Sequence, residues 1–145
     1  MADQAHQYDT RVEWTEGRRA TLIAPPRNEI AIGAPAEFGG TNDVWSPEHL
    51  CVAAVNSCVM LTFLTIAANS KVTVRRYSSS ATGTLEKVEG SGPVITQVVV
   101  RPQVTVPADT DRTRVERLLK MAERNCWISN SLKARVTLEP EIRGE

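Results

Sequence analysis

Three cysteines are the side chains in this sequence best suited to chemistry. Cys51 and Cys58 lie seven residues apart in the apolar stretch EHLCVAAVNSC, and Cys126 lies far downstream in RNCWISNSL. A cysteine can act as a nucleophile, ligate a metal or pack as a small apolar group, and its surroundings decide which. The first question is therefore which of the three thiols could form a bond with another.

Helical geometry excludes a bond between the first two cysteines. Seven residues of helix span about 10.5 Å at 1.5 Å per residue, whereas a disulfide needs Cα atoms within about 7 Å. Within one chain Cys126 is then the only candidate partner for either Cys51 or Cys58. We expect no metal site, because the chain has 2 histidines and no C-x-x-C pair.

Glu48, Cys51 and Cys58 recur at helical spacing and therefore share one face of a helix. The carboxylate would lie at the helix start, about 15 Å before the Cys58 thiol. Cys51 lies within LCVAAV and is interpreted as a small apolar group of the core. Cys58 ends the triplet NSC, whose two polar side chains need partners if buried, so we expect this segment to border a cleft.

A thiol in the middle of a helix gains little from the helix dipole and needs a nearby cation to stabilise its thiolate. The stretch EGRRA supplies Arg18 and Arg19 at the start of an expected strand. An arginine that reaches across the helix could be held by Glu48. The alternative for either arginine is a solvated charge at the end of a strand.

The elements that would position these residues follow from patterning. Three short strands are expected in YDTRVEW, RRATLIA and EIAIG, with turns at EG and PPRN. A helix is expected from Pro47 to Asn69, because Ser46 can cap it and proline suits the first helical position. Residues 71–90 and 93–106 are rich in β-branched side chains and predict an antiparallel hairpin, in which Pro102 indicates a bulge or an edge.

A second helix, capped by Asp109 or Thr110, should end near Asn125, because apolar residues recur there at helical spacing. A short helical turn in CWISNSL and one strand over residues 133–142 complete the chain. The predicted fold is one α+β domain over residues 1–145, with residues 1–7 disordered. It has a curved antiparallel sheet and a long buried central helix, whose apolar surface favours a homodimer.

Composition narrows the classes of function. Lys+Arg and Asp+Glu both number 17, which argues against a nucleic-acid or membrane-surface binder. Residues 50–68 carry no charge and approach a membrane-spanning length, but Asn, Ser and Thr interrupt them, so a buried helix is favoured over a membrane span. We see no signal peptide and expect a cytoplasmic protein with redox-active rather than structural cysteines.

The stretches WSPEHLCVAAVNSC and AERNCWISNSL together resemble the OsmC/Ohr family of thiol-dependent hydroperoxide reductases. The resemblance implies an intertwined homodimer with active sites at the subunit interface. It implies a peroxidatic Cys58, a resolving Cys126, and a Glu48 that orients an arginine, which could be Arg18, Arg19 or Arg27. Organic hydroperoxides would be the substrates, a dithiol such as a lipoyl group the reductant, and no metal or organic cofactor would be needed.

In the implied reaction, Cys58 becomes a sulfenic acid and then forms a disulfide with Cys126. Apolar neighbours such as Leu61 and Trp127 would favour an alkyl peroxide, unless they belong to the core. The alternative function is a non-enzymatic binding protein that holds an apolar ligand or peptide in the dimer cleft. A third interpretation pairs Cys51 with Cys126 in redox exchange.

Overall fold

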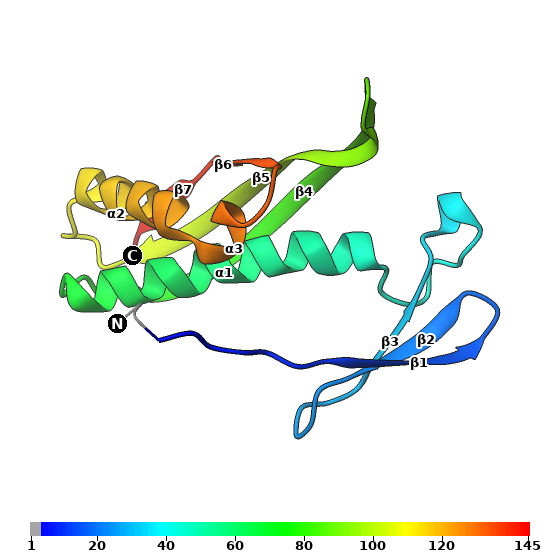
Figure 1. Ribbon diagram of the computed structural model, residues 1–145. Helices are drawn as coiled ribbons and strands as arrows, with labels where there is room; N and C mark the ends of the chain where they lie inside the picture. Colours follow the sequence, from blue (N-terminus) through cyan, green and yellow to red (C-terminus); the bar gives the residue numbers. More distant parts are fainter. Residues whose placement is uncertain (1–3) are drawn as a thin grey trace. The chain divides into compact units, whose positions relative to one another are not determined.

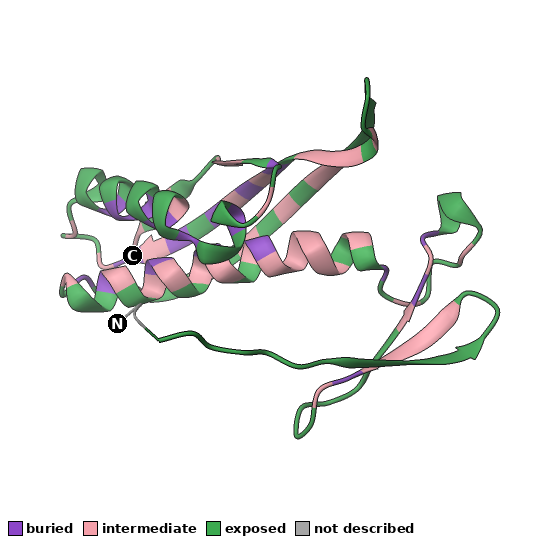
Figure 2. Cartoon of the chain, in the orientation of Figure 1, coloured by how far each residue is buried: buried purple, intermediate pink, exposed green. Residues whose placement is uncertain are grey.

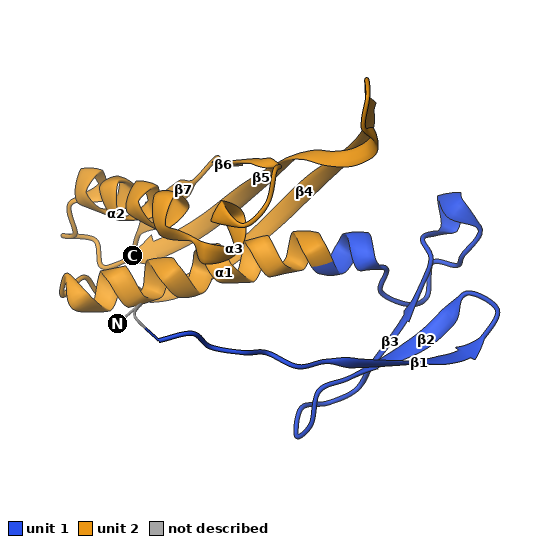
Figure 3. Cartoon of the chain, in the orientation of Figure 1, with its two compact units in different colours: residues 1–50 blue, residues 51–145 orange. Residues whose placement is uncertain are grey.

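The computed structural model of the chain describes residues 4–145 and divides into two compact units, residues 1–50 and 51–145 (Figure 3). The expected disorder of residues 1–7 falls partly on residues 1–3, which lie outside the described residues. Residues 4–7 are exposed and belong to no helix or strand.

The first unit contains a three-stranded antiparallel sheet, as the sequence predicts. Its strands, in spatial order, are β1 (Arg11–Glu16), β2 (Arg19–Ile23) and β3 (Ile30–Gly33). The β1–β2 turn is tight, with Gly17 at a positive φ of 51°. Every residue of β1 is exposed, so neither face of this strand is buried by the described residues (Figure 2).

The long helix α1 (Pro47–Asn69) has the bounds that the sequence predicts. Ser46 is buried and caps it, because its Oγ accepts a hydrogen bond from the His49 amide at 3.1 Å. The same oxygen lies 2.6 Å from the His49 ring nitrogen Nδ1. At the other end the chain turns through Lys71, which has a left-handed φ of 59°.

The second unit is built on a mixed sheet. Its strands are β4 (Arg76–Val88), β5 (Gly92–Val106), β6 (Arg135–Leu138) and β7 (Glu141–Gly144). The β4–β5 hairpin is antiparallel, as predicted, whereas β6 and β7 both pair with β5 in parallel. The antiparallel sheet that the sequence predicts therefore carries two parallel pairings. The prediction of one final strand was wrong, because Pro140 divides the last segment into β6 and β7.

Pro102 occupies the central strand β5 and not the expected edge or bulge. On one side it pairs with Ser79 of β4. On the other side β6 pairs with residues 97–100 and β7 with residues 103–106, so Pro102 faces the break between them. The carbonyls of Val100 and Val106 accept hydrogen bonds on this side. Because residues two apart along a strand point the same way, an amide at position 102 would point into this break, where neither β6 nor β7 pairs with β5.

Two helices cover one face of this sheet. Helix α2 (Arg112–Asn125) lies beside α1, and both pack on the buried side of β5 (Figure 1). Phe63 of α1 and Leu119 of α2 are among the largest fully buried side chains of this core. The cap of α2 is Asp111, which accepts from the Thr113 amide at 3.0 Å, and not Asp109 or Thr110 as predicted.

Helix α1 buries only one stripe of its surface in the chain. The buried residues follow one face, at Val55, Val59, Phe63 and Ala67. By length and composition α1 could cross a membrane, with a mean hydropathy of 2.1 over a window that is 22% buried. Core helices of globular proteins meet the same criterion, so this single helix is weak support for a membrane span.

Candidate functional site

The fold brings Cys58 and Cys126 together inside the second unit. Cys58 is half-buried on α1, and Cys126 is fully buried between the end of α2 and the start of the short helix α3 (Trp127–Asn130). Cys126 belongs to an apolar cluster formed by α1 and β5, and Cys58 packs against this cluster. Each thiol shifts the pKa of the other, and neither is in a disulfide.

The surroundings of Cys58 stabilise its thiolate. Burial alone would raise the pKa of this thiol, but hydrogen bonds outweigh burial and the net pKa is lowered. The donors, in order of effect, are the Cys126 thiol, the Ile128 amide, the Thr62 hydroxyl and the Trp127 amide. All four are neutral groups, so within the chain the Cys58 thiolate is stabilised by dipoles.

The pKa of Cys126 moves in the opposite direction. Burial in the apolar cluster raises it first, and the hydrogen bond with Cys58 raises it further. Contacts from Ser129 lower it in part, and the Ser129 amide lies 3.5 Å from the Cys126 sulfur. The pair therefore favours one thiolate, on Cys58, beside one thiol, on Cys126.

Sequence reasoning missed the donors around Cys58. Thr62 lies one helical turn after Cys58, with its Oγ1 3.9 Å from the sulfur, and this i, i+4 spacing was a usable signal. The amides of Trp127 and Ile128 face the sulfur because the chain turns into α3 directly after Cys126. Every residue other than proline has a backbone amide, so residue type does not show which amides face the Cys58 sulfur, and the tertiary structure was needed to identify them.

The other polar residues near Cys58 have structural partners. Asn56 is clamped to β4, where its side-chain oxygen accepts from the Ser79 hydroxyl at 2.5 Å. The Ser57 hydroxyl donates to the carbonyl of Ala53 at 2.8 Å, within its own helix. Cys51 is a half-buried free thiol on α1. The two polar side chains of the NSC triplet, Asn56 and Ser57, thus have hydrogen-bond partners in β4 and in α1 itself.

Glu48 lies in the first turn of α1, as predicted, and belongs to the first unit. Its Oε1 atom is buried and has no hydrogen-bond partner among the described residues. A buried carboxylate oxygen without a donor is costly, and such an atom indicates a place where a donor binds.

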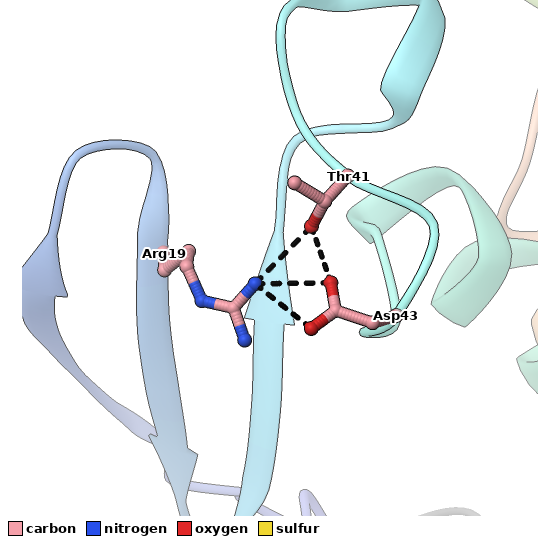
Figure 4. A network of polar contacts seen from close by, with 3 residues as sticks. All are labelled: Arg19, Thr41 and Asp43. Carbon is pink, nitrogen blue, oxygen red and sulfur yellow. Dashed lines mark hydrogen bonds and ion pairs between the residues drawn. The ribbon is translucent and has the colours of Figure 1, made fainter.

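Arg19 does not supply that donor. Its guanidinium forms an ion pair with Asp43 at 3.0 Å and a hydrogen bond with the Thr41 hydroxyl at 3.1 Å (Figure 4). Hydrogen bonds from Arg19 and then from Thr41 lower the pKa of Asp43 to about 2. The structure therefore places Arg19 in an exposed loop network, with its charge shared by an acidic partner.

Arg18 lines the same pocket as Glu48. This pocket of the first unit has a volume of about 420 Å³, and its walls include Trp14, Ile32 and Phe38. The Arg18 guanidinium makes one long hydrogen bond, 3.3 Å, to the carbonyl of Phe38. Arg27, the third arginine considered, donates to the carbonyls of its own turn at Ala24 and Pro25. Arg18 and Arg19 both line the pocket that contains Glu48, and of these two Arg19 already has an acidic partner in Asp43.

The thiol pair is suited to sulfur-centred redox chemistry. A stabilised thiolate next to a protonated second thiol can be oxidised and then captured as a disulfide. Among residues 4–145 no cluster of three or more His, Cys, Asp or Glu side chains could hold a metal ion.

Comparison with known proteins gives a consistent result. The family model described as OsmC-like protein matches residues 40–141. The chain is 28% identical over 116 residues to the protein named peroxiredoxin OsmC of Escherichia coli, covering 80% of this chain and 79% of that protein.

Solved structures agree in fold. An OsmC-like protein of unknown function from Vibrio cholerae matches with a TM-score of 0.87 and 27% identity, covering 94% of this chain and 99% of that one. An organic hydroperoxide resistance protein from Elizabethkingia anophelis matches with a TM-score of 0.74 and 18% identity, covering 98% and 100% of the two chains. The second likeness extends to the fold alone.

Proposed function

Because the chain belongs to the OsmC-like protein family, we propose that it is a thiol-dependent peroxidase that reduces organic hydroperoxides. One observation carries this proposal: the fold brings Cys58 and Cys126 to the same apolar cluster as free thiols, with Cys58 the more accessible and Cys126 buried. In agreement, the pKa is lowered at Cys58 and raised at Cys126. Peroxide chemistry needs this division of roles, because one sulfur attacks the peroxide as a thiolate and the other reacts only after the sulfenic acid has formed.

In the proposed reaction, the Cys58 thiolate attacks the distal oxygen of the hydroperoxide. The O–O bond breaks, the distal OH passes to sulfur so that Cys58 becomes a sulfenic acid, and the leaving alkoxide takes a proton from solvent to give the alcohol. The Cys126 sulfur then attacks the Cys58 sulfur, which forms the disulfide and releases water. A dithiol, of which a lipoyl group is one type, restores both thiols by exchange.

We assign the arginine of the proposed mechanism to Arg18. Arg18 and Arg19 both line the pocket of Glu48, but Arg19 is paired with Asp43, whereas the Arg18 guanidinium donates only to the Phe38 carbonyl among the described residues. Arg27 donates to its own turn. An arginine held by Glu48 would keep a fixed position and a full charge. Arg18→Ala should therefore slow peroxide reduction more than Arg19→Ala.

The homodimer remains part of this proposal. Exposed apolar side chains on β1 and α1 support it, since Trp14 is 75% exposed and Leu61 is 58% exposed. A second copy of the chain would cover such surfaces. Sedimentation at several protein concentrations measures the assembly directly.

Peroxide turnover with a dithiol tests the proposed function. Wild type and Cys51→Ser should reduce an alkyl hydroperoxide, Cys58→Ser should be inactive, and Cys126→Ser should accumulate a sulfenic acid that a carbon nucleophile can trap. Mass spectrometry of a digest after one equivalent of peroxide should find a Cys58–Cys126 peptide. Full activity of Cys58→Ser would refute the mechanism, and inert thiols would favour the binding protein. A Cys51–Cys126 peptide would favour the exchange pair.

A further inference from the structure

Ser129 is a buried polar residue whose side chain the proposed reaction does not yet use. It lies in α3 and is 8% exposed. Its hydroxyl oxygen is buried and has no hydrogen-bond partner of ordinary geometry among the described residues. A hydroxyl that loses water on burial without gaining a partner is destabilising, so its position calls for an explanation.

The geometry of α3 places Ser129 against Cys126. The Cys126 sulfur caps this helix by accepting a hydrogen bond from the Ser129 amide at 3.5 Å. Residues three apart at a helix start face each other, so the Ser129 side chain is held on the Cys126 side of the turn. Cys126 is fully buried, so no solvent reaches its sulfur to stabilise a negative charge.

We propose that Ser129 is a positioning residue for the resolving step: its hydroxyl and amide together donate to the Cys126 sulfur as that sulfur becomes a thiolate. The inference rests on the proposed function. In the proposed peroxidase reaction, Ser129 would make the buried Cys126 thiol nucleophilic in the step that forms the disulfide.

The step is balanced in atoms and electrons. After peroxide attack, Cys58 carries a sulfenic acid and Cys126 a thiol. The Cys126 proton passes to the sulfenic hydroxyl, the S–O bond breaks and water leaves, while the Cys126 electron pair forms the S–S bond. The two-electron oxidation that the peroxide introduced at Cys58 is divided between the two sulfur atoms of the disulfide, so no further oxidant is needed.

The resting state and the reacting state differ in what Ser129 can donate to. A neutral thiol is a weak acceptor, whereas a thiolate is a strong one. A hydroxyl without a partner in the resting pair is therefore satisfied only when charge develops on Cys126, and such an interaction accelerates the step in which the charge appears. In agreement, contact with the Ser129 side chain lowers the pKa of Cys126, against burial and Cys58, which both raise it.

Single-turnover oxidation of Ser129→Ala in the full chain tests this role. A Cys51→Ser background removes the third thiol, and one equivalent of tert-butyl hydroperoxide starts the reaction. Sulfenic acid on Cys58 and the Cys58–Cys126 disulfide are then followed in acid-quenched samples by mass spectrometry. Formation of the sulfenic acid should be unchanged, and closure of the disulfide should be about tenfold slower, the effect of a tenfold smaller thiolate fraction.

Matched variants separate a donor from a structural effect. Ser131→Ala removes the hydroxyl of the residue that directly follows α3, which donates to the Trp127 carbonyl at 2.7 Å, and should close the disulfide at the parent rate. Ser129→Thr keeps the hydroxyl and should restore most of the rate. The pH profile of closure in Ser129→Ala should move to higher pH, which a packing defect alone would not cause.

The outcomes distinguish the two proposals. If the parent forms the disulfide and Ser129→Ala closes it at the same rate and with the same pH profile, the role of Ser129 is refuted while the peroxidase proposal stands. If the parent forms no sulfenic acid on Cys58, the peroxidase proposal fails and the role of Ser129 fails with it.

Discussion

Removal of the Cys126 thiol should weaken the thiolate of Cys58. The Cys126 thiol is the strongest of the four hydrogen-bond donors that lower the Cys58 pKa, and the other three remain in a Cys126→Ala variant. In a Cys51→Ser background this variant keeps Cys58 as its single thiol, because the chain has 3 cysteines. The parent for comparison is Cys51→Ser alone.

The expected size follows from the strength of one bond to a charged group. Such hydrogen bonds contribute about 1.5–3 kcal/mol, and Cys58 is half-buried, so solvent screening places the effect at the low end. A free energy of about 1.4 kcal/mol corresponds to a tenfold change in an equilibrium. Below its pKa, Cys58 should therefore be ionised about tenfold less in Cys126→Ala than in the parent.

The assay is the pH dependence of thiolate absorbance together with alkylation of Cys58. In the parent, alkylation at low pH reports Cys58, because Cys126 is fully buried and its pKa is raised. Alkylation should slow by only about threefold below the pKa, since a more basic thiolate is also more nucleophilic. Cys126→Ser retains a hydroxyl donor and should recover part of the effect.

An unchanged midpoint in a folded Cys126→Ala protein would refute the reasoning. Circular dichroism and thermal unfolding would show whether the variant is folded. The same titration in Thr62→Val checks the second side-chain donor, whose 3.9 Å contact should give a smaller change in the same direction. A larger change in Thr62→Val than in Cys126→Ala would reverse the order of the two donors.

Three further predictions concern stability, ionisation and assembly. Gly83→Ala should lower the free energy of unfolding in urea by about 1–3 kcal/mol, because a Cβ there would collide with Val52 on α1; unaltered stability would show that the helix moves freely away from β4. Arg19→Ala should raise the pKa of Asp43 from about 2 towards the ordinary value of about 3.9 in an NMR titration. Because the Asp43 pKa is lowered in the folded state, its pair adds stability above the ordinary pKa and loses it as pH falls towards 2, but the amount should be small at this exposed site. The midpoint of thermal unfolding should rise with protein concentration if a second copy covers β1 and α1, and a constant midpoint would count against the homodimer.

The two thiols should also oppose each other in the pH dependence of stability. A lowered pKa at Cys58 adds stability that is present above the ordinary thiol pKa of about 8.5 and lost as pH falls through the folded value. A raised pKa at Cys126 adds stability that is present below the ordinary value and lost as pH rises through the folded one. Their sum should leave a shallow dependence between pH 7 and 9, approximately the range around that ordinary value.

Local signals in the sequence were sufficient where the structure is local. Helix α1 has its predicted bounds, because Ser46 and Pro47 define its start by rules that act within one turn. The three strands of the first unit are bounded by turns with glycine or proline and were predicted within a few residues. The cap of α2 was predicted two residues or one residue early, since Asp109, Thr110 and Asp111 all suit that position.

Such local signals do not predict contacts between residues that are far apart in the sequence. The parallel pairing of β6 and β7 with β5 depends on where α2 returns the chain, and strand composition does not encode it. The choice between Arg18 and Arg19 required the position of Asp43, which lies 24 residues from Arg19 in the sequence. The meeting of Cys58 with Cys126 was implied by the family resemblance and not by spacing, because spacing only excluded Cys51 from pairing with Cys58.

The break beside Pro102 has a consequence for how the chain finds its final pairing. Pro140 separates β6 from β7, and the two pairings end at Val100–Leu138 and begin again at Gln103–Glu141, so Pro140 lies at the level of Pro102 within β5. A slip of the last segment by one residue would turn Val136, Leu138 and Ile142 away from the helices. It would also set a proline opposite a carbonyl that needs a donor. Pro102 and Pro140 therefore disfavour a shifted register of the last segment. Replacement of both should increase the fraction of misfolded chains more than it lowers the free energy of unfolding.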